Sequence, residues 1–272
     1  MSEEEVPVVE NGDEAAAAEP EIPAGPQYML MTDAFPGISK FSDETWKCEG
    51  APNWRRVPGF PIYATAQPNK ADVDKCVEQA VKKYDEQKNV LWVNLRQEPV
   101  VYVNGLPHSV RNSDDLAGHI VLNEAFEINN IENKMASEIK KAGEFTFCKD
   151  LIGERAQEIV PEYKSESGRV DSVNTLSEVF SFATKKEPKL EFKKIPLELN
   201  AAPMEDTFDM IIRLLKGHGS AIPVIFNCQG GMARSSVASV IAGIIKETQL
   251  ENEFSKMKGW FLNLTLVMNF NR

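Results

Sequence analysis

The sequence predicts an α/β protein in which a central sheet is flanked by helices. Short apolar runs typical of buried strands alternate with longer stretches whose apolar residues recur at helical spacing. With 272 residues, of which 42% are hydrophobic and 26% charged, the chain is long enough to bury a full core. The simplest organisation is one main domain that follows a tail.

The N-terminal tail is defined by its charge. The first 26 residues contain eight acidic residues, no lysine or arginine, and a run of four alanines. Such a segment cannot bury enough apolar surface to order itself. We therefore expect residues 1–27 to be a disordered acidic tail and residues 28–272 to form the domain. The alternative use of the tail is as a docking arm for a basic partner, whose identity the composition does not give.

The first half of the domain contains two expected strands and one expected helix. Residues 61–66 and 89–95 are short and apolar, as buried strands are. Between them, residues 70–87 repeat apolar side chains on one helical face. Asn104 and Gly105 then interrupt an apolar run, which predicts the turn of a β-hairpin.

The second half continues the alternation with one gap. Residues 133–142 and 204–216 have helical periodicity, and residues 190–197 have the composition of a strand. Residues 144–187 show no clear period, so we interpret them as a variable insertion.

The most informative stretch lies near the C-terminal end of this pattern. An apolar strand at 221–226 leads into Cys228, a loop with two glycines follows, and Arg234 stands six residues after the cysteine. Apolar residues at helical spacing then predict a helix over 235–246. The alternative is a buried structural cysteine followed by a surface arginine.

This strand, loop and helix arrangement is suited to binding an anion. Loop amides that lead into a helix N-terminus bind phosphate oxygens, and their positive field favours the thiolate form of a cysteine placed there. A guanidinium at Arg234 supplies a planar fork for two phosphate oxygens. Gly230 and Gly231 allow the backbone angles that such a loop needs.

Four segments together resemble a known family. The loop is similar to the Cys-x5-Arg-Ser/Thr loop of the protein tyrosine phosphatase superfamily, and residues 91–105, Leu-Trp-Val-Asn-Leu-Arg-Gln-Glu-Pro-Val-Val-Tyr-Val-Asn-Gly, resemble its phytase-like branch, in particular the paladin family. Residues 50–68 and 195–209 resemble the same branch. The resemblance implies a cysteine-phosphatase-like central sheet and the hydrolysis of phosphate monoesters through a cysteinyl-phosphate.

The resemblance also implies roles for single residues. Cys228 is the nucleophile, Arg234 binds the phosphoryl group, and Ser235 supplies the hydroxyl that assists release of the thiolate. The loop residues that bind phosphate are Gln229, Gly230, Gly231, Met232, Ala233 and Arg234. Arg96 and Glu98 either orient this loop or form only a local ion pair.

Three departures from the family pattern affect the expected rate of phosphate hydrolysis. The family's general acid stands four residues before a proline, and here Leu199 holds that place before Pro203. Glu198 is the nearest carboxylate and is our candidate general acid, with Glu205 and Asp206 beyond it. Asn227 replaces a usual histidine before the cysteine, and Ala233 replaces a usual glycine, which is a penalty if that position needs a positive φ. These changes predict slower turnover.

Two functions follow from these residues. One is a cysteine-dependent phosphatase acting on an inositol phosphate, a phosphoinositide headgroup or a phosphoprotein, and intact Cys228 and Arg234 favour it. The other is a phosphate-binding pseudophosphatase or scaffold, which Leu199 favours. The sequence cannot choose the substrate.

The composition also bears on cofactors, partners and localisation. We expect no metal and no cofactor, because no Cys/His cluster has ligand spacing, and no nucleic-acid partner, because no basic stripe is present. No signal peptide or membrane-spanning run is recognisable, so we expect a cytosolic protein. Only residues 249–272 follow the predicted active-site helix, from which we expect a C-terminally truncated domain.

Overall fold

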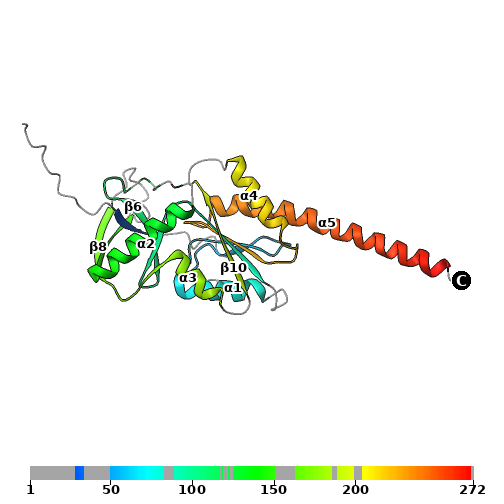
Figure 1. Ribbon diagram of the computed structural model, residues 1–272, viewed down its shortest axis with the longest axis horizontal. Helices are drawn as coiled ribbons and strands as arrows, with labels where there is room; N and C mark the ends of the chain where they lie inside the picture. The colour runs from blue at the N-terminus through cyan, green and yellow to red at the C-terminus, as the bar shows by residue number, and fades with distance from the viewer. Residues whose placement is uncertain are drawn as a thin grey trace, which may run out of the picture.

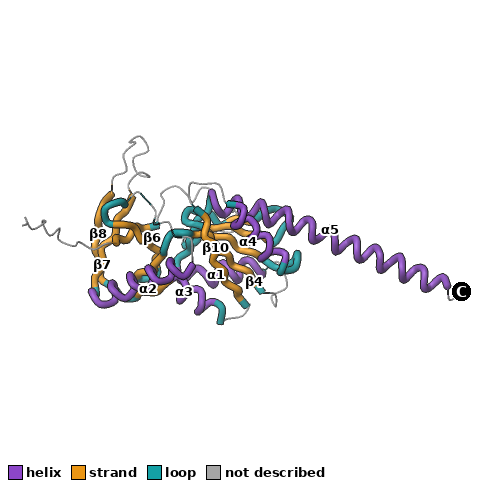
Figure 2. The backbone as a smooth tube through the Cα atoms, turned by 45° about the horizontal axis from the view of Figure 1, so that its top comes forward, coloured by secondary structure: helices purple, strands orange, loops and turns teal. Residues whose placement is uncertain are grey.

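The computed structural model describes residues 28–33, 50–82, 89–116, 118, 120, 122, 125–150, 163–185, 189–198 and 204–270. The predicted tail, residues 1–27, lies outside them. Within the described residues one sheet of five strands and one of six lie side by side, with helices packed against them (Figures 1 and 2). The α/β prediction is confirmed.

The five-stranded sheet has the order β10-β4-β11-β3-β2. Its strands are β2 (Arg55–Arg56), β3 (Ile62–Thr65), β4 (Val90–Arg96), β10 (Leu190–Leu197) and β11 (Val224–Asn227). β10, β4, β11 and β3 are parallel, and β2 pairs antiparallel with β3. Every residue of β4 and β11 is buried, as expected of strands covered on both faces. The predicted strands over 61–66, 89–95 and 190–197 are confirmed.

Helices cover both faces of this sheet. α1 (Val73–Val81) and α3 (Leu176–Ala183) share a core with Trp92 and other residues of one face. α4 (Glu205–Lys216) and α5 (Ala233–Phe270) share a core with the opposite face. Alternate residues of β4 and β11 enter the two cores, which is the two-residue period of a strand.

The helix boundaries correct two predictions. α1 ends at Val81 instead of residue 87, and residues 83–88 lie outside the described part. α5 begins two residues before the predicted helix and continues to Phe270, far beyond residue 246. It runs away from the body of the molecule as a long rod, orange to red in Figure 1. A search of the described helices finds none that is both long and apolar enough to cross a membrane.

The six-stranded sheet was not predicted as such. Its order is β8 (Tyr163–Arg169), β7 (Glu144–Asp150), β1 (Tyr28–Thr32), β6 (Leu106–Asn112), β5 (Val100–Val103) and β9 (Val173–Thr175). Residues 144–187, which we had interpreted as a variable insertion, supply three of these strands and α3. They therefore contribute to the core under α1 and α3 and to the core of the six-stranded sheet, and the insertion hypothesis is wrong.

The hairpin between β5 and β6 confirms the turn prediction. Asn104 and Gly105 both have positive φ, 52° and 80°, as a tight two-residue hairpin turn requires. α2 (Ala125–Ala142) covers this sheet and begins eight residues before the predicted helix.

A buried ion pair joins the two sheets near the start of β5. Glu132 of α2 accepts from the backbone N–H of Val100 at 3.0 Å and from Lys194 of β10, also at 3.0 Å. Because Lys194 belongs to the five-stranded sheet and Val100 to the other, this carboxylate fixes their relative position. The polypeptide that crosses between the sheets here contains Glu98.

Candidate active site

The candidate site lies where the parallel strands of the five-stranded sheet end. Cys228 follows β11, Gln67 lies just past β3, Glu98 lies just past β4, and Glu198 directly follows β10. The carboxyl ends of parallel strands meet at one edge, which is where ligands bind in open α/β sheets. The sequence prediction of a strand, a loop and a helix over 224–246 is confirmed, with the loop at residues 228–232.

Three donors hold the carbonyl groups of the loop. The Gln67 backbone N–H donates to the Gln229 carbonyl at 3.2 Å. Asn53 Nδ2 donates to the Gly230 carbonyl at 2.6 Å, and Arg55 Nη1 donates to the Gly231 carbonyl. These three consecutive carbonyls therefore face protein groups outside the loop.

The orientation of the carbonyls determines that of the amides. In a planar trans peptide the C=O and the following N–H point in opposite directions. The N–H groups of residues 230, 231 and 232 therefore point away from the three donors, as consecutive amides of an anion-binding loop do. This supports the predicted phosphate-binding role of the loop.

Position 231 requires glycine for two reasons, its backbone conformation and the lack of room for a Cβ. Its φ is +70°, and an added Cβ would lie 2.3 Å from the Ala66 backbone nitrogen. Ala233, by contrast, is the first residue of α5 and is absent from the residues with positive φ. The conformational penalty that we considered for Ala233 does not arise.

Cys228 and Ser235 lie together beneath the loop. The Cys228 Sγ is 3.5 Å from the Ser235 Oγ, and both residues are buried. Arg55 is close to them, since its Nη2 donates to Ser236 Oγ at 2.8 Å. Burial lowers the pKa of the Arg55 guanidinium, and negative charge on Cys228 acts in the opposite direction. The arrangement suits a hydroxyl that donates to the thiolate.

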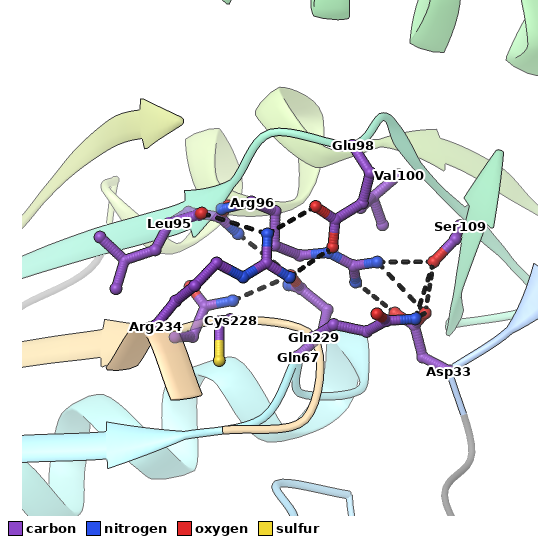
Figure 3. Close-up of polar contacts among 12 residues, drawn as sticks. Asp33, Gln67, Leu95, Arg96, Glu98, Val100, Ser109, Cys228, Gln229 and Arg234 are labelled. Atoms are coloured by element: carbon purple, nitrogen blue, oxygen red, sulfur yellow. Dashed lines mark hydrogen bonds and ion pairs between the residues drawn. The ribbon is translucent and has the colours of Figure 1, made fainter. Parts of the chain in front are cut away.

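Arg234 is held by one edge of its guanidinium. Nη1 and Nη2 donate to the two carboxylate oxygens of Glu98 at 2.6 and 2.8 Å (Figure 3). Nη1 also donates to the carbonyls of Leu197, at 3.1 Å, and Leu95, at 3.4 Å. Glu98 therefore occupies the fork that we had expected to hold phosphate.

The Nε on the other edge of the Arg234 guanidinium is buried and lacks an acceptor among the described residues. Nη2 carries two hydrogens and uses one for Glu98. Glu98 thus fixes the Nη1–Nη2 edge of the guanidinium, while the buried Nε has no acceptor among the described residues.

A cluster of alternating charges lies behind Arg234. Arg96 Nε donates to Glu98 at 2.8 Å, and its Nη1 and Nη2 reach Asp33. Ser109 Oγ accepts from Arg96 and donates to Asp33 (Figure 3). Although burial lowers the pKa of Arg96, the charges of Asp33 and Glu98 outweigh that effect and hold this pKa above its usual value. Of the two alternatives for Arg96 and Glu98, the structure favours orientation of the loop.

Asn227, which replaces the usual histidine, belongs to a buried amide network. Its Nδ2 donates to Gln67 Oε1 at 2.9 Å, and Trp92 Nε1 donates to its Oδ1 at 2.7 Å. Asn94 Nδ2 also donates to Gln67 Oε1, at 3.0 Å, and Gln67 Nε2 donates to Tyr102. Because the Gln67 backbone holds the loop, Asn227 takes part in shaping it.

The candidate general acid lies at the rim. Glu198 is exposed and directly follows Leu197, whose carbonyl accepts from Arg234. Residues 199–203 lie outside the described part, so the role of Glu198 stays a prediction. Glu205 and Asp206 occupy the exposed first turn of α4, where acidic residues stabilise the helix dipole.

Sequence reasoning did not assign Asp33, Asn53, Arg55 or Ser109 to the site. The signal for Asn53 and Arg55 was available, since both lie in a segment that carried the family resemblance. Within the described residues no group of three His, Cys, Asp or Glu side chains could hold a metal ion.

A family comparison decides where this chain belongs. The model of PTP-like phytases, described by the words inositol hexakisphosphate, matches residues 93–246, more than half of the chain. The chain belongs to the PTP-like phytase family. The matched residues of this PTP-like phytase domain include the end of β4, with Arg96, and also Glu98, Ser109 and the whole active-site loop.

Paladins are similar in sequence, as the resemblance implied. Paladin of Xenopus tropicalis is 28% identical over 230 residues, which cover 81% of this chain and 24% of that protein. Human paladin is 27% identical over 198 residues, which cover 70% and 20% respectively. The chain is paladin-like and spans a quarter or less of the length of these paladins.

Two solved structures from Mitsuokella multacida have a similar fold. A PTP-like myo-inositol phosphatase in complex with myo-inositol-(1,3,4,5)-tetrakisphosphate matches with a TM-score of 0.54 and 16% identity, covering 82% of this chain and 37% of that one. A tandemly repeated PTP-like phytase matches with a TM-score of 0.54 and 17% identity, covering 83% and 37%. The cysteine-phosphatase-like fold is thereby confirmed.

Proposed function

We propose that this domain is a cysteine-dependent phosphatase that hydrolyses phosphate monoesters, with inositol phosphates as its first candidate substrates. The observation that carries the proposal is the buried Arg234 Nε, a charged donor that has no acceptor among the described residues, in a site that also contains Cys228. A buried donor left unpaired costs free energy that a phosphate oxygen would recover. Membership of the PTP-like phytase family supports the same chemistry.

The reaction would proceed in two displacements. The Cys228 thiolate attacks phosphorus, an S–P bond forms, and the P–O bond to the leaving group breaks. A carboxylic acid, for which Glu198 is our candidate, gives the leaving oxygen its proton. Water then attacks phosphorus and gives a proton to the carboxylate left by the first displacement, while the S–P bond breaks with its electrons returning to sulfur. The Ser235 hydroxyl donates a hydrogen bond to the released thiolate.

The fixed edge of Arg234 is important for both displacements. Charge accumulates on the equatorial phosphoryl oxygens during transfer, and donors that are already oriented stabilise it without reorganisation. Glu98 orients Arg234, while the amides of residues 230–232 are oriented by the groups that hold the loop carbonyls. Arg234 and the loop amides are therefore both oriented by other protein groups before an anion binds.

The substrate class rests on the relatives. One structurally similar protein binds an inositol tetrakisphosphate, as the description of its complex states. For this chain we propose soluble inositol phosphates first, and phosphoinositide headgroups or phosphoproteins as alternatives.

A phosphate-release assay over inositol phosphates, phosphoinositides and phosphopeptides tests the proposal. We expect wild type to release phosphate, and Cys228→Ser to lose turnover while it keeps affinity for the anion. Arg234→Lys should weaken both binding and rate, because an ammonium cannot reproduce the planar fork of a guanidinium. Equal trace release by wild type and Cys228→Ser on every substrate would reject the enzyme.

The general acid has its own test. If Glu198 donates the proton, Glu198→Gln should lower the rate strongly with alkyl phosphates and weakly with p-nitrophenyl phosphate, whose leaving group needs little protonation. Glu205→Gln is the matched control at the first turn of α4. An equal effect of Glu198→Gln on both substrates would exclude this role.

The second candidate function is a non-catalytic phosphate-binding scaffold. Leu199 at the family's acid position and the exposure of Glu198 favour it. It predicts anion binding by wild type with no phosphate release from any substrate of the panel.

A further inference from the structure

The buried amide network that contains Asn227 has one fixed direction. Trp92 Nε1 can only donate, and it donates to Asn227 Oδ1 at 2.7 Å, so the NH2 group of Asn227 faces Gln67. The backbone N–H of Arg96 donates to Asn94 Oδ1 at 2.9 Å, which turns the NH2 group of Asn94 toward Gln67 as well. Gln67 Oε1 therefore accepts two hydrogen bonds, and its own NH2 group points to a third partner.

That third partner is Tyr102 of β5. Gln67 Nε2 donates to the Tyr102 hydroxyl at 2.7 Å, and this hydroxyl donates to the Pro68 carbonyl at 3.0 Å. Because a carbonyl can only accept, the order of donors and acceptors is fixed at this end of the network too. Burial raises the pKa of the Tyr102 hydroxyl above its usual value, so the hydroxyl keeps the proton that it donates.

Tyr102 thus holds the same short segment that holds the active-site loop. Its hydroxyl bonds to the side chain of Gln67 and to the backbone of Pro68. The backbone N–H of Gln67 donates to the Gln229 carbonyl at 3.2 Å. In a planar peptide that carbonyl fixes the direction of the following N–H, which belongs to Gly230. A displacement of Gln67 would therefore turn one of the amides that face the anion.

This contact is a second route from the six-stranded sheet to the loop. Val101 and Val103 enter the core of that sheet, whereas Tyr102 enters the core shared with α1 and α3. The alternation of β5 thus directs the Tyr102 side chain into the five-stranded part of the molecule. Glu98, the first route, orients Arg234, while Tyr102 reaches the loop backbone through Gln67.

We propose that Tyr102 is a positioning residue of the active-site loop: its hydroxyl holds Gln67 where the Gln67 N–H orients the Gln229 carbonyl, and with it the following amide, for phosphate. The proposal rests on the proposed function of the Cys228 loop, whose anion site it concerns. Tyr102 acts through Gln67 and would not touch the substrate. The alternative is a buried hydroxyl that contributes to stability alone.

Two tyrosines of the same core form a matched pair for the test. Tyr63 on β3 is buried like Tyr102, but its hydroxyl donates to the carbonyl of Ala80 in α1, at 3.2 Å. Tyr102→Phe and Tyr63→Phe each remove one buried hydroxyl, and both should lower the urea midpoint of the full chain. Only Tyr102→Phe should affect the loop.

Hydrogen exchange of the Gln67 backbone amide reports the link to the loop without any substrate. Tyr102→Phe should speed this exchange about 3- to 10-fold beyond what its lower global stability explains, the range expected for one lost neutral hydrogen bond. Tyr63→Phe should show no such excess. Unchanged exchange in Tyr102→Phe, or an equal excess in Tyr63→Phe, would overturn the proposal.

Anion affinity is the readout that a purely structural hydroxyl would not change. In a Cys228→Ser background, isothermal titration with inorganic phosphate should give a Kd that rises about 3- to 10-fold with Tyr102→Phe and stays within twofold with Tyr63→Phe. Faster exchange with an unchanged phosphate Kd would overturn the positioning role. Faster exchange in a chain that neither binds nor releases phosphate would reject the proposed function alone.

A further variant keeps the test decisive if Tyr102→Phe does not fold. Gln67→Met removes the amide at the centre of the network and retains a side chain of similar length. It should speed exchange at position 67 and weaken phosphate at least as much as Tyr102→Phe, because it also leaves the NH2 groups of Asn94 and Asn227 without their acceptor. Exchange and affinity that equal those of the Tyr63→Phe control would overturn the proposal.

Discussion

The two sheets contribute to the site in different ways. The five-stranded sheet is parallel around β4 and β11, is covered on both faces, and delivers Cys228 and Arg234 from one loop. The six-stranded sheet is largely antiparallel and delivers single side chains, Asp33 at the end of β1 and Ser109 from β6. The first sheet thus carries the groups that we propose to react, and the second carries groups that contact and orient them.

Glu98 couples the docking of the two sheets to the orientation of Arg234. The polypeptide from β4 to β5 crosses between the sheets, and Glu98 within it binds Arg96 and Arg234 together. A buried carboxylate between two guanidinium groups is stable only while both partners stay in place. The active-site arginine is therefore oriented correctly only when the two sheets are docked.

Glu98→Gln should have the largest effect, because it breaks this connection. It removes the shared charge from two buried arginines, which we expect to lower the free energy of unfolding by about 3–5 kcal/mol. We also expect kcat/KM to fall roughly 100-fold through misorientation of Arg234. Urea unfolding and phosphate release measure the two effects. Full stability and full activity of this variant would contradict the orienting role of Glu98.

Gly231→Ala should have the next largest effect, confined to the first sheet. The new Cβ would meet the Ala66 nitrogen and the Thr65 carbonyl carbon, at 2.3 and 2.5 Å, in addition to the strain of a positive φ. The matched control is Gly59→Ala, where φ is +83° but nothing lies within 4 Å. The control should lose about 1–2 kcal/mol of stability and no activity, whereas Gly231→Ala should lose more stability and roughly 100-fold in rate. Equal losses in the two variants would contradict the close packing of the loop.

Asp33→Asn tests the contribution of the second sheet alone. Arg96 would keep Glu98 but lose a charged partner, so we expect a stability loss of about 1.5–3 kcal/mol and a severalfold lower kcat/KM. Asp171→Asn, at an exposed ion pair with Arg169, should cost about 0–1 kcal/mol and leave kcat/KM unchanged. Thermal unfolding and phosphate release of both variants make the comparison. If Asp33→Asn matches its control, β1 does not support the site.

His108 gives the smallest expected effect, and it is visible only as a pH dependence. The ring is buried and meets the stacked rings of Phe145 and Phe147 edge to face, and burial lowers the pKa of His108 despite the opposing charge of Asp33. The unfolded chain then binds this proton before the folded chain does, so stability should fall as pH decreases below about 6.5. In His108→Phe this part of the decrease should be absent when urea midpoints are compared between pH 7.5 and 5. An identical pH dependence would contradict the assignment.

The strands of the five-stranded sheet could be predicted from the sequence better than those of the six-stranded sheet, because the two sets of strands differ in burial. Strands such as Val224–Asn227 are buried on both faces and are therefore continuously apolar, which is a strong local signal. Tyr163–Arg169 is an edge strand, mostly exposed, with charged and polar residues. Its sequence carries no periodicity that distinguishes it from a loop, so residues 163–169 could not be assigned.

The residues of the candidate site also differ in how well the sequence predicts them. Cys228, Arg234 and Ser235 lie within eight residues, and the strand, loop and helix around them, together with the family resemblance, predicted their chemistry. Asn53 contacts the loop across 177 positions of sequence, and Gln229 approaches Asp33 across 196. No local pattern encodes such contacts, and a buried charge such as Asp33 cannot be distinguished from a surface one in a single sequence.

The most direct test of the central claim is whether Cys228 becomes phosphorylated during turnover. Wild-type protein would be mixed with p-nitrophenyl phosphate, quenched rapidly in acid, digested and analysed by mass spectrometry for a phosphoryl group on the Cys228 peptide. We predict a phosphorylated Cys228 in wild type and none in Cys228→Ser, together with loss of phosphate release in that variant. Phosphate release that persists in Cys228→Ser, or turnover by wild type without a phosphorylated Cys228, would contradict the account.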